Sequence, residues 1–250
     1  MNKVKPKKAL GQHFLTDLNI ADRIAATIND YRHLPALEVG PGMGVLTRFL
    51  LQRDPDVTAV EIDSESVEWL HCNFPGLRVV EGDFLQLDLA EVMGNRPFTV
   101  IGNYPYNISS QIFFRILDYK DLIPCCAGML QREVAERLAA GPGTKARGIL
   151  SVLLQAWYDV EYLFTVSENV FNPPPKVKSG VIRLTRNSRT DLGCDPARFK
   201  AIVKATFGQR RKTIRNSIRS VIPDFPADHP LAGQRPEQLS VTDFISLAHL

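Results

Sequence analysis

The chain has 250 residues, of which 44% are hydrophobic and 23% are charged, and it contains 16 Gly and 17 Pro. This composition excludes disordered, collagen-like and disulfide-rich proteins, and the length suits one large domain and a small one. The net charge of +3 conceals two uneven regions: residues 31–120 hold 7 basic and 12 acidic side chains, whereas residues 172–222 hold 13 and 2. Only the second region favours binding to nucleic acid.

Cysteine usage and hydropathy indicate a compartment. Cys72, Cys125, Cys126 and Cys194 form no C-x-x-C pair and have no His at metal-ligand spacing, so they predict free thiols in a reducing environment and no metal site. No run of about 18 apolar residues predicts a membrane span, and no signal-type apolar core follows the N-terminal lysines. We therefore expect a cytoplasmic protein without membrane contacts.

The spacing of apolar residues predicts a first helix from about Asp17 to Ile28, with Thr16 or Asp17 as its N-cap. Five apolar runs then predict strands at 36–39, 57–62, 77–80, 98–101 and 123–130. Helical patterns follow them, beginning near Val45, Ser64, Leu85, Ile108 and Arg132. Such alternation predicts an α/β fold with a mostly parallel, Rossmann-like sheet whose ligand lies at the carboxyl ends of the strands.

The remaining chain changes pattern twice. Runs at 149–160, 162–166 and 181–184 come with little helix between them and predict strands added antiparallel at one edge of the sheet. From Pro196 onward the pattern is helical again, up to a last helix over 239–250. We place a domain boundary near Ser188, which divides the chain into an α/β domain at 1–188 and a small all-helical domain at 189–250.

Three strand ends carry residues that suit a nucleoside. Glu38 leads into a turn with Gly40, Gly42 and Gly44, where a ligand can approach the backbone because no Cβ is in the way. The next strand ends at Glu61, whose carboxylate can accept hydrogen bonds from both ribose hydroxyls. The third strand leads to Asp83, which can accept from an adenine amine. The G-x-G-x-G spacing departs from the dinucleotide fingerprint and argues against a dinucleotide oxidoreductase.

The fourth strand ends in Asn103-Tyr104-Pro105-Tyr106, the most informative tetrapeptide of the chain. An exocyclic amine of a base is a poor nucleophile because its lone pair is delocalised into the ring. The Asn103 side-chain oxygen and the Tyr104 carbonyl can accept the two amine hydrogens and direct the lone pair at an electrophilic methyl group. Pro105 stiffens the turn, and Tyr106 offers a ring on which the base can stack. The alternative is a simple proline turn with partly buried aromatic residues.

Together these motifs resemble the ribosomal RNA adenine dimethyltransferase family. The similar segments are Lys7 to Leu15, Glu38 to Thr47, Asn103 to Tyr106, Phe171 to Val177 and Phe207 to Thr213. The similarity extends from about Lys7 to the end of the chain and is best to the members that act on small-subunit (16S) rRNA. It implies S-adenosyl-L-methionine as cofactor, no metal, and dimethylation of two adjacent adenines in the 3′-terminal hairpin loop. The expected partner is the immature small subunit, and the expected state is a monomer.

The resemblance also assigns site residues. The cofactor contacts would be His13, Leu15, Glu38, Gly40, Gly42, Glu61, Asp83 and Asn103. His13 and Leu15 would border the methionine end, and Asn103 would contact both cofactor and target. Phe171 would close on the flipped base opposite Tyr106. Tyr104 stands where the family usually has Leu, although the role expected there belongs to the backbone carbonyl.

A basic region predicts the RNA-binding surface. Residues 196–223 contain eight Lys and Arg and no acidic residue, and Arg211, Arg215 and Arg219 have the spacing of one helix face. The residues that we expect to follow the RNA phosphates are Lys176, Lys178, Arg210, Arg211, Lys212, Arg215 and Arg219. The lysines at positions 3, 5, 7 and 8 add charge of the same sign.

Two alternatives share the same fold. One is the related large-subunit rRNA methyltransferase that confers macrolide resistance, and the other is a non-catalytic RNA-binding assembly factor. The F-x-P-x-P-K-V segment and the long C-terminal region favour the small-subunit enzyme. The intact Glu38, Glu61, Asp83 and Asn103 favour a catalytic protein.

Overall fold

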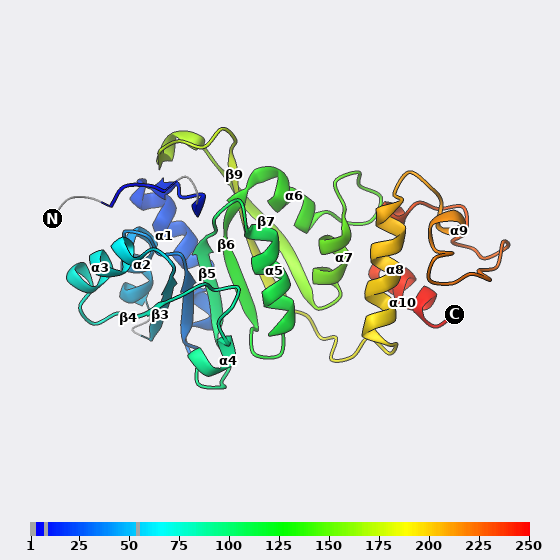
Figure 1. Cartoon of the computed structure of the whole chain (residues 1–250), viewed down its shortest axis with the longest axis horizontal. Coiled ribbons are helices and arrows are strands. Elements are labelled where there is room, and N and C mark those ends of the chain that lie inside the picture. The colour runs from blue at the N-terminus through cyan, green and yellow to red at the C-terminus, as the bar shows by residue number, and fades with distance from the viewer. Residues whose placement is uncertain (1–3, 8–9, 54–55) are drawn as a thin grey trace. The chain divides into compact units, whose positions relative to one another are not determined.

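The computed structural model describes residues 4–7, 10–53 and 56–250 (Figure 1). The chain forms two compact units. One comprises Met1–Ala135 with Glu161–Arg186, and the other Glu136–Val160 with Asn187–Leu250. The predicted domains of 1–188 and 189–250 differ from these units by residues 187–188 and by the segment 136–160, both of which belong with the C-terminal helices.

A seven-stranded sheet has the order β4-β3-β2-β5-β6-β9-β7. Its parallel strands are β2 (Ala36–Val39), β3 (Val57–Glu61), β4 (Arg78–Glu81), β5 (Thr99–Asn103) and β6 (Cys125–Gln131). They overlap the five predicted apolar runs. β2, β3, β5 and β6 are almost wholly buried, as strands covered on both faces are, whereas β4 at the edge of the sheet is exposed at both ends. β9 (Ser179–Arg186) pairs antiparallel with β6, and β7 (Tyr158–Val166) forms the edge beyond it. The predicted Rossmann-like sheet is confirmed.

The helices of the α/β part follow the strands in alternation. They are α1 (Leu18–Ala26), α2 (Val45–Arg53), α3 (Ser64–Asn73), α4 (Leu89–Val92), α5 (Ser109–Asp118) and α6 (Arg132–Ala139). Asp17 caps α1, because its Oδ1 accepts from the amides of Asn19 and Ile20 at 2.9 and 3.1 Å. The helix predicted from Leu85 begins only at Leu89, where Asp88 accepts from the first amides.

The strand predicted at 149–160 is wrong in its first part. Residues Ile149–Gln155 form helix α7, and β7 begins only at Tyr158. The five residues from Leu150 to Leu154 are all buried, so the helix is buried on every side, and all but Ser151 are apolar. Such a run does not distinguish a strand from a buried helix by periodicity. The contact of α7 with α8 (Pro196–Gly208) stabilises this run as a helix.

The basic segment is not one helix. After α8 ends at Gly208, α9 covers only Ile214–Ser217, so Arg211 and Arg219 lie in flanking turns instead of sharing a helix face with Arg215. The amides of Ile214 and Arg215 donate to the carbonyls of Gln234 and Ala232, which ties this short helix to a distant segment. The last helix, α10 (Val241–Ala248), packs on α8, with the rings of Phe207 and Phe244 6.0 Å apart.

A second, two-stranded sheet connects distant motifs. β1 (Phe14–Leu15) pairs antiparallel with β8 (Phe171–Asn172), which joins two segments of the family signature. Two-residue strands show no periodicity, so the sequence does not predict this pairing. The short 3-10 helices are η2 (Asn29–Tyr31), η3 (Glu168–Val170) and η4 (Pro236–Gln238).

Three negative findings concern the described residues. None of their helices is long and apolar enough to cross a membrane. No three of their His, Cys, Asp and Glu side chains are grouped so that they could hold a metal ion. The four cysteines are free thiols, and Cys125 and Cys126 are buried.

The packing of α1 can be tested with two positions on the same helix. Ile24 is fully buried in the core, whereas Leu18 is 47% exposed. We expect Ile24→Ala to lower the free energy of unfolding by about 2–4 kcal/mol, because it leaves a cavity, and Leu18→Ala to change it by less than about 0.5 kcal/mol. Urea denaturation measures both values, and equal effects would contradict the burial of this helix face.

Candidate active site

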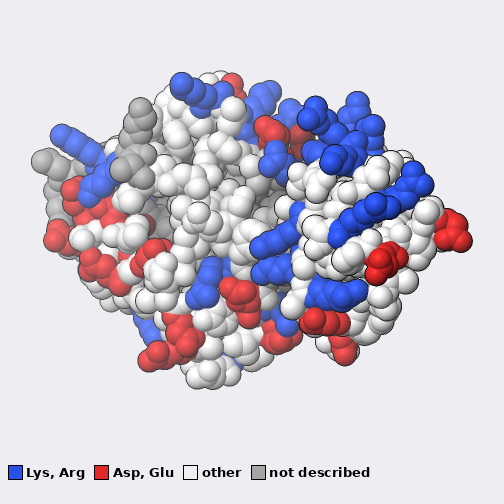
Figure 2. All heavy atoms as spheres, turned by 45° about the vertical axis from the view of Figure 1, so that its right-hand side comes forward, with Lys and Arg blue, Asp and Glu red and all other residues white. Residues whose placement is uncertain are grey.

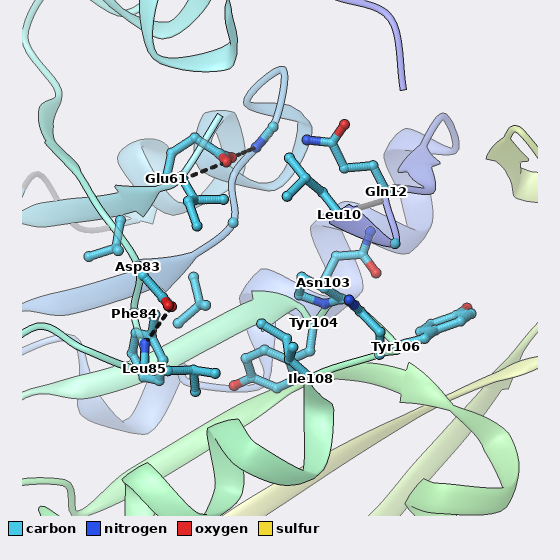
Figure 3. Close-up of a pocket in the computed structure, with 18 of the residues that line it drawn as sticks. Leu10, Gln12, Glu61, Asp83, Phe84, Leu85, Asn103, Tyr104, Tyr106 and Ile108 are labelled. Atoms are coloured by element: carbon cyan, nitrogen blue, oxygen red, sulfur yellow. Dashed lines mark hydrogen bonds between the residues drawn. The ribbon is translucent and has the colours of Figure 1, made fainter. Parts of the chain in front are cut away.

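One cleft lies at the carboxyl ends of the parallel strands, where the topology of the sheet predicts a ligand. Its walls come from residues 10–14, 39–42, 60–62, 82–85 and 103–108. Figure 3 shows Glu61 and Asp83 toward one end of the cleft and Tyr106 toward the other, with Asn103 between them. The motifs at the ends of β2, β3, β4 and β5 therefore meet in one place, as the sequence predicts.

Glu61 is 4% exposed, and backbone amides surround its carboxylate. Its Oε2 accepts from the Gly42 amide at 3.0 Å (Figure 3), and its Oε1 accepts from the amides of Ile62 and Asp63 at 2.9 Å. Burial raises the pKa of Glu61, and these three hydrogen bonds oppose that rise. The side chain thus holds the glycine turn against β3, and one lone pair of Oε2 remains for a hydroxyl donor.

The three glycines of the turn serve different purposes. Gly40 has φ +63°, and a Cβ there would meet nothing closer than Pro105 at 3.9 Å, so the backbone is open toward the cleft. A Cβ on Gly42 would come within 2.8 Å of the Phe14 ring, and one on Gly44 would collide with Phe74. Gly40 is therefore the glycine that leaves room for a ligand, whereas the other two leave room for the protein itself.

Asp83 offers a free acceptor. It is half-buried, its Oδ1 accepts from the Leu85 amide at 2.9 Å, and no group of the described residues donates to its other oxygen. Nearby, Ile62 lines the cleft with 51% of its surface exposed. Two carboxylates, an exposed apolar side chain and the open Gly40 backbone fit an adenosine group that carries positive charge.

Asn103 ends β5 at the centre of the cleft. Its Nδ2 donates to the His13 carbonyl at 3.0 Å, which orients the amide, and no described group donates to its Oδ1. The Tyr104 amide donates to the Met129 carbonyl at 2.9 Å and continues the pairing of β5 with β6. The Asn103 oxygen and the Tyr104 carbonyl therefore stand on a fixed turn, as acceptors for an amine must.

The structure explains the unusual Tyr104. Its ring is 1% exposed and lies over two glycines, because a Cβ on Gly102 or Gly128 would come within 3.0 or 2.5 Å of it. The hydroxyl donates to the Ala127 carbonyl at 2.7 Å and lies 3.3 Å from the Cys126 sulfur. Burial raises the pKa of Tyr104, so the phenol remains a donor. The side chain of Tyr104 is thus buried beneath the turn, and its backbone borders the cleft.

Tyr106 lies at the opposite end of the cleft from Asp83 (Figure 3). Its half-buried ring packs on the His13 ring with 5.4 Å between centroids. The His13 Nδ1 is 2.8 Å from the Pro173 carbonyl oxygen, a contact that connects the N-terminal motif to the proline-rich loop. Tyr106 thus places an aromatic ring on the cleft wall, and its stacking on a base stays a prediction.

Three predicted site residues do not line this cleft. Glu38 is 1% exposed and lies beneath the turn, in a small adjoining cavity that it shares with Leu15, Gly40 and Asn103. Leu15 and Phe171 are paired across β1 and β8 and are buried in the core. The alternation of a strand turns Phe171 inward and leaves Asn172 exposed. A stack of Phe171 opposite Tyr106 requires β8 to move and stays a prediction.

The predicted RNA-binding residues are exposed on both units. Arg210, Arg211, Lys212, Arg215 and Arg219 lie on the second unit, where Figure 2 shows many Lys and Arg side chains and few acidic ones. Lys176 and Lys178 are exposed in the loop before β9 of the first unit. Of the N-terminal lysines, 3 and 8 lie outside the described residues. Lys7 forms ion pairs with Asp63 and Glu65, so it is a structural residue and not part of a free basic surface.

Comparison with known proteins gives a family and full-length relatives. The family model described as ribosomal RNA adenine dimethylase matches residues 3–239. A protein of Parabacteroides distasonis named ribosomal RNA small subunit methyltransferase A is 63% identical over 253 residues, which cover 99% of this chain and 94% of the relative. The protein of the same name from Flavobacterium johnsoniae is 52% identical over 250 residues, with 99% and 96% covered.

Two solved structures share the fold. A dimethyladenosine transferase from Plasmodium falciparum superposes with a TM-score of 0.77 at 24% identity, covering 94% of this chain and 96% of that one. The 23S rRNA methyltransferase ErmE superposes with a TM-score of 0.70 at 28% identity, covering 95% and 100%. The likeness extends over both units of the chain.

The buried carboxyl of Glu38 predicts a pH-dependent stability. Burial raises the pKa of Glu38 from 4.5 to about 8, and its Oε2 has no hydrogen-bond partner among the described residues. The folded state therefore keeps a proton that the unfolded state releases. The contribution of this proton to the free energy of unfolding is complete below pH 4.5 and is lost as the pH rises toward about 8. Glu38→Gln should remove this pH-dependent loss in the free energy of unfolding, which is on the order of 1.4 kcal/mol per pH unit.

The measurement is the difference in free energy of unfolding between Glu38→Gln and the wild type across this pH range. That difference should move in favour of the variant as the pH rises, because all other titrating groups are shared. Glu68→Gln, at an exposed position on α3, is the matched control. A difference that stays constant with pH would contradict the protonated Glu38.

Proposed function

The chain belongs to the ribosomal RNA adenine dimethylase family and is an S-adenosyl-L-methionine-dependent rRNA adenine methyltransferase, and we propose that its substrate is small-subunit (16S) rRNA. The relatives named small subunit methyltransferase A support this substrate, because their identity to the chain spans both units and far exceeds that of the large-subunit enzyme. The observation that carries the chemistry is the Asn103–Tyr106 turn, which ends β5 beside a cleft suited to adenosine.

The finer proposal concerns the target. The enzyme acts as the small-subunit dimethyladenosine transferase and dimethylates N6 of two adjacent adenines in the 3′-terminal hairpin loop. It acts in the cytoplasm on an immature small subunit, as a monomer. The presence of both a nucleoside cleft and a basic surface in one chain supports this proposal.

The cofactor end of the cleft is proposed to hold an adenosine group through side chains already oriented there. Glu61 accepts from the ribose hydroxyls and Asp83 from the adenine amine, while the open backbone at Gly40 allows close approach. His13 lies at the methionine end, Gly42 lines the cleft, and Leu15 and Glu38 form the layer beneath. When bound, S-adenosyl-L-methionine supplies an electrophilic methyl group on a positively charged sulfur, so the chemistry requires neither a metal nor a nucleophilic side chain.

The target end is proposed to receive a flipped adenine. The base stacks on Tyr106, and its N6 hydrogens bond to the Asn103 Oδ1 and the Tyr104 carbonyl. The two acceptors localise the nitrogen lone pair and point it away from the base plane, toward the cofactor end of the cleft. The proton that N6 loses after methylation leaves to water.

The basic residues of the second unit, with Lys176 and Lys178 of the first, are proposed to bind RNA phosphates. Arg211, Arg215 and Arg219 are exposed and have no acidic partner within the described chain. Their placement in turns and a short helix suits recognition of the backbone and shape of folded RNA more than readout of bases.

Methyl transfer tests the enzymatic proposal. The protein is incubated with labelled S-adenosyl-L-methionine and either unmethylated small-subunit particles or large-subunit RNA, and the label is mapped. We expect label on two adjacent adenines of small-subunit rRNA, and a fall in kcat of about 100-fold or more for Asn103→Ala, since a preorganised acceptor is lost.

Asn73→Ala, at an exposed position on α3, is the matched control and should behave like the wild type. Transfer to neither RNA would overturn the enzymatic role. Label on large-subunit RNA alone would keep the reaction and overturn the substrate.

Salt dependence tests the basic surface. The double variant Arg211→Ala with Arg215→Ala should bind RNA more weakly and should lower the slope of log Kd against log salt by about 1–2, because fewer counterions are released. Filter binding at several salt concentrations measures the slope, and calorimetry measures cofactor affinity, which should not change. The matched control replaces the exposed Arg32 and Arg48 of the first unit. An unchanged slope with weakened cofactor binding would show that Arg211 and Arg215 act structurally.

A further inference from the structure

Ser179, the first residue of β9, makes an unexplained contact with the target end of the cleft. Its side chain is fully buried, and its Oγ lies 2.5 Å from the Tyr106 hydroxyl. Ser179 is paired with Gln131 at the end of β6, so its backbone belongs to the central sheet and not to a loose loop. A rigid element therefore holds the far end of the Tyr106 ring.

The same ring is held at a second point. The His13 ring packs on it, and His13 is in turn held through Nδ1 by the Pro173 carbonyl at 2.8 Å. Pro173 begins the short loop of residues 173–178 that leads into Ser179 at the start of β9, and Pro174 and Pro175 restrict the backbone of this loop. Ser179 thus contacts the Tyr106 hydroxyl, and the loop before it reaches the ring carbons through His13.

A tyrosine at a strand end can turn about two side-chain bonds, and the plane of its ring sets where a stacked base lies. Methyl transfer requires the N6 atom in front of the acceptors on Asn103 and Tyr104, and a shift of about 1 Å is costly for catalysis. Burial raises the pKa of Tyr106, so the phenol stays neutral and keeps its hydrogen bond to Ser179.

We propose that Ser179 is a positioning residue, whose hydroxyl holds the Tyr106 ring in the plane on which the target adenine stacks. This inference rests on the proposed function, because it assumes that Tyr106 receives the base. Ser179 itself does not touch the base and acts through Tyr106. The contact would otherwise stabilise only the junction between the β5 turn and β9.

A double-mutant cycle separates these two roles. Ser179→Ala, Tyr106→Phe and the double variant all keep the aromatic ring and lose the same hydrogen bond. We expect each single variant to lower kcat on unmethylated small-subunit particles about three- to tenfold, with cofactor affinity unchanged. The double variant should match the singles within about twofold, because the contact can be lost only once.

A spectroscopic measurement reports the ring directly. An RNA hairpin with 2-aminopurine at the target adenine is bound in the presence of S-adenosylhomocysteine, and stacking on Tyr106 quenches its fluorescence. Ser179→Ala should reduce this quenching and raise its heterogeneity, which a purely structural contact would not do. Unfolding by urea is measured for every variant, so that a loss of stability is distinguished from a loss of orientation.

The chain offers a matched control pair. Tyr162 is half-buried and Thr165 is exposed on β7, and their hydroxyl oxygens are 2.7 Å apart. Tyr162→Phe and Thr165→Val should leave kcat and fluorescence unchanged.

The outcomes for the two proposals are distinguishable. The role of Ser179 alone is overturned if the wild type methylates small-subunit particles and Ser179→Ala retains wild-type kcat and quenching. An additive double-mutant cycle on active protein overturns it as well. Transfer only to large-subunit RNA overturns the substrate alone, and the cycle is then measured on that RNA, where coupling still supports Ser179.

Discussion

The hydrogen bond from the Tyr104 amide to the Met129 carbonyl fixes the turn on which the site depends. It extends the β5–β6 pairing by one residue beyond Asn103, so that two acceptors leave the sheet at a defined angle. The buried Tyr104 ring reinforces this turn from below, since it fills the space over Gly102 and Gly128 and donates to Ala127. A larger side chain than the usual Leu is accommodated because the sheet provides two glycines beneath it.

The N-terminal motif reaches this turn by long-range contacts. The side-chain amide of Asn103 donates to the His13 carbonyl, and β1 pairs with β8. The His13 Nδ1 is hydrogen-bonded to the Pro173 carbonyl. Segments separated by about 150 residues therefore meet at the target end of the cleft. This explains physically why the N-terminal G-Q-H-F-L segment and the proline-rich segment occur together: each supplies part of the support for Tyr106.

Acidic and basic side chains lie in different parts of the chain. The cleft contains the acidic side chains of Glu61 and Asp83, which suit a cationic nucleoside, and the protonated Glu38 lies buried just beneath it. The second unit presents exposed arginines, which suit phosphates. The modest net charge of +3 is the sum of these opposite regions.

The sequence by itself determined the parallel strands and the residues at their ends. β2 to β6 are local apolar runs, and Glu61, Asp83 and Asn103 follow them, so topology alone brings them together. Tertiary structure decided everything that depends on distant partners. The run from Leu150 to Leu154 is a helix because it is buried against α8. Arg211 and Arg219 lie outside the helix because the start of α9 is hydrogen-bonded to residues 232–234. Phe171 faces the core because it pairs with Leu15. Periodicity describes a residue's own neighbours along the chain, and these outcomes were set by neighbours in space.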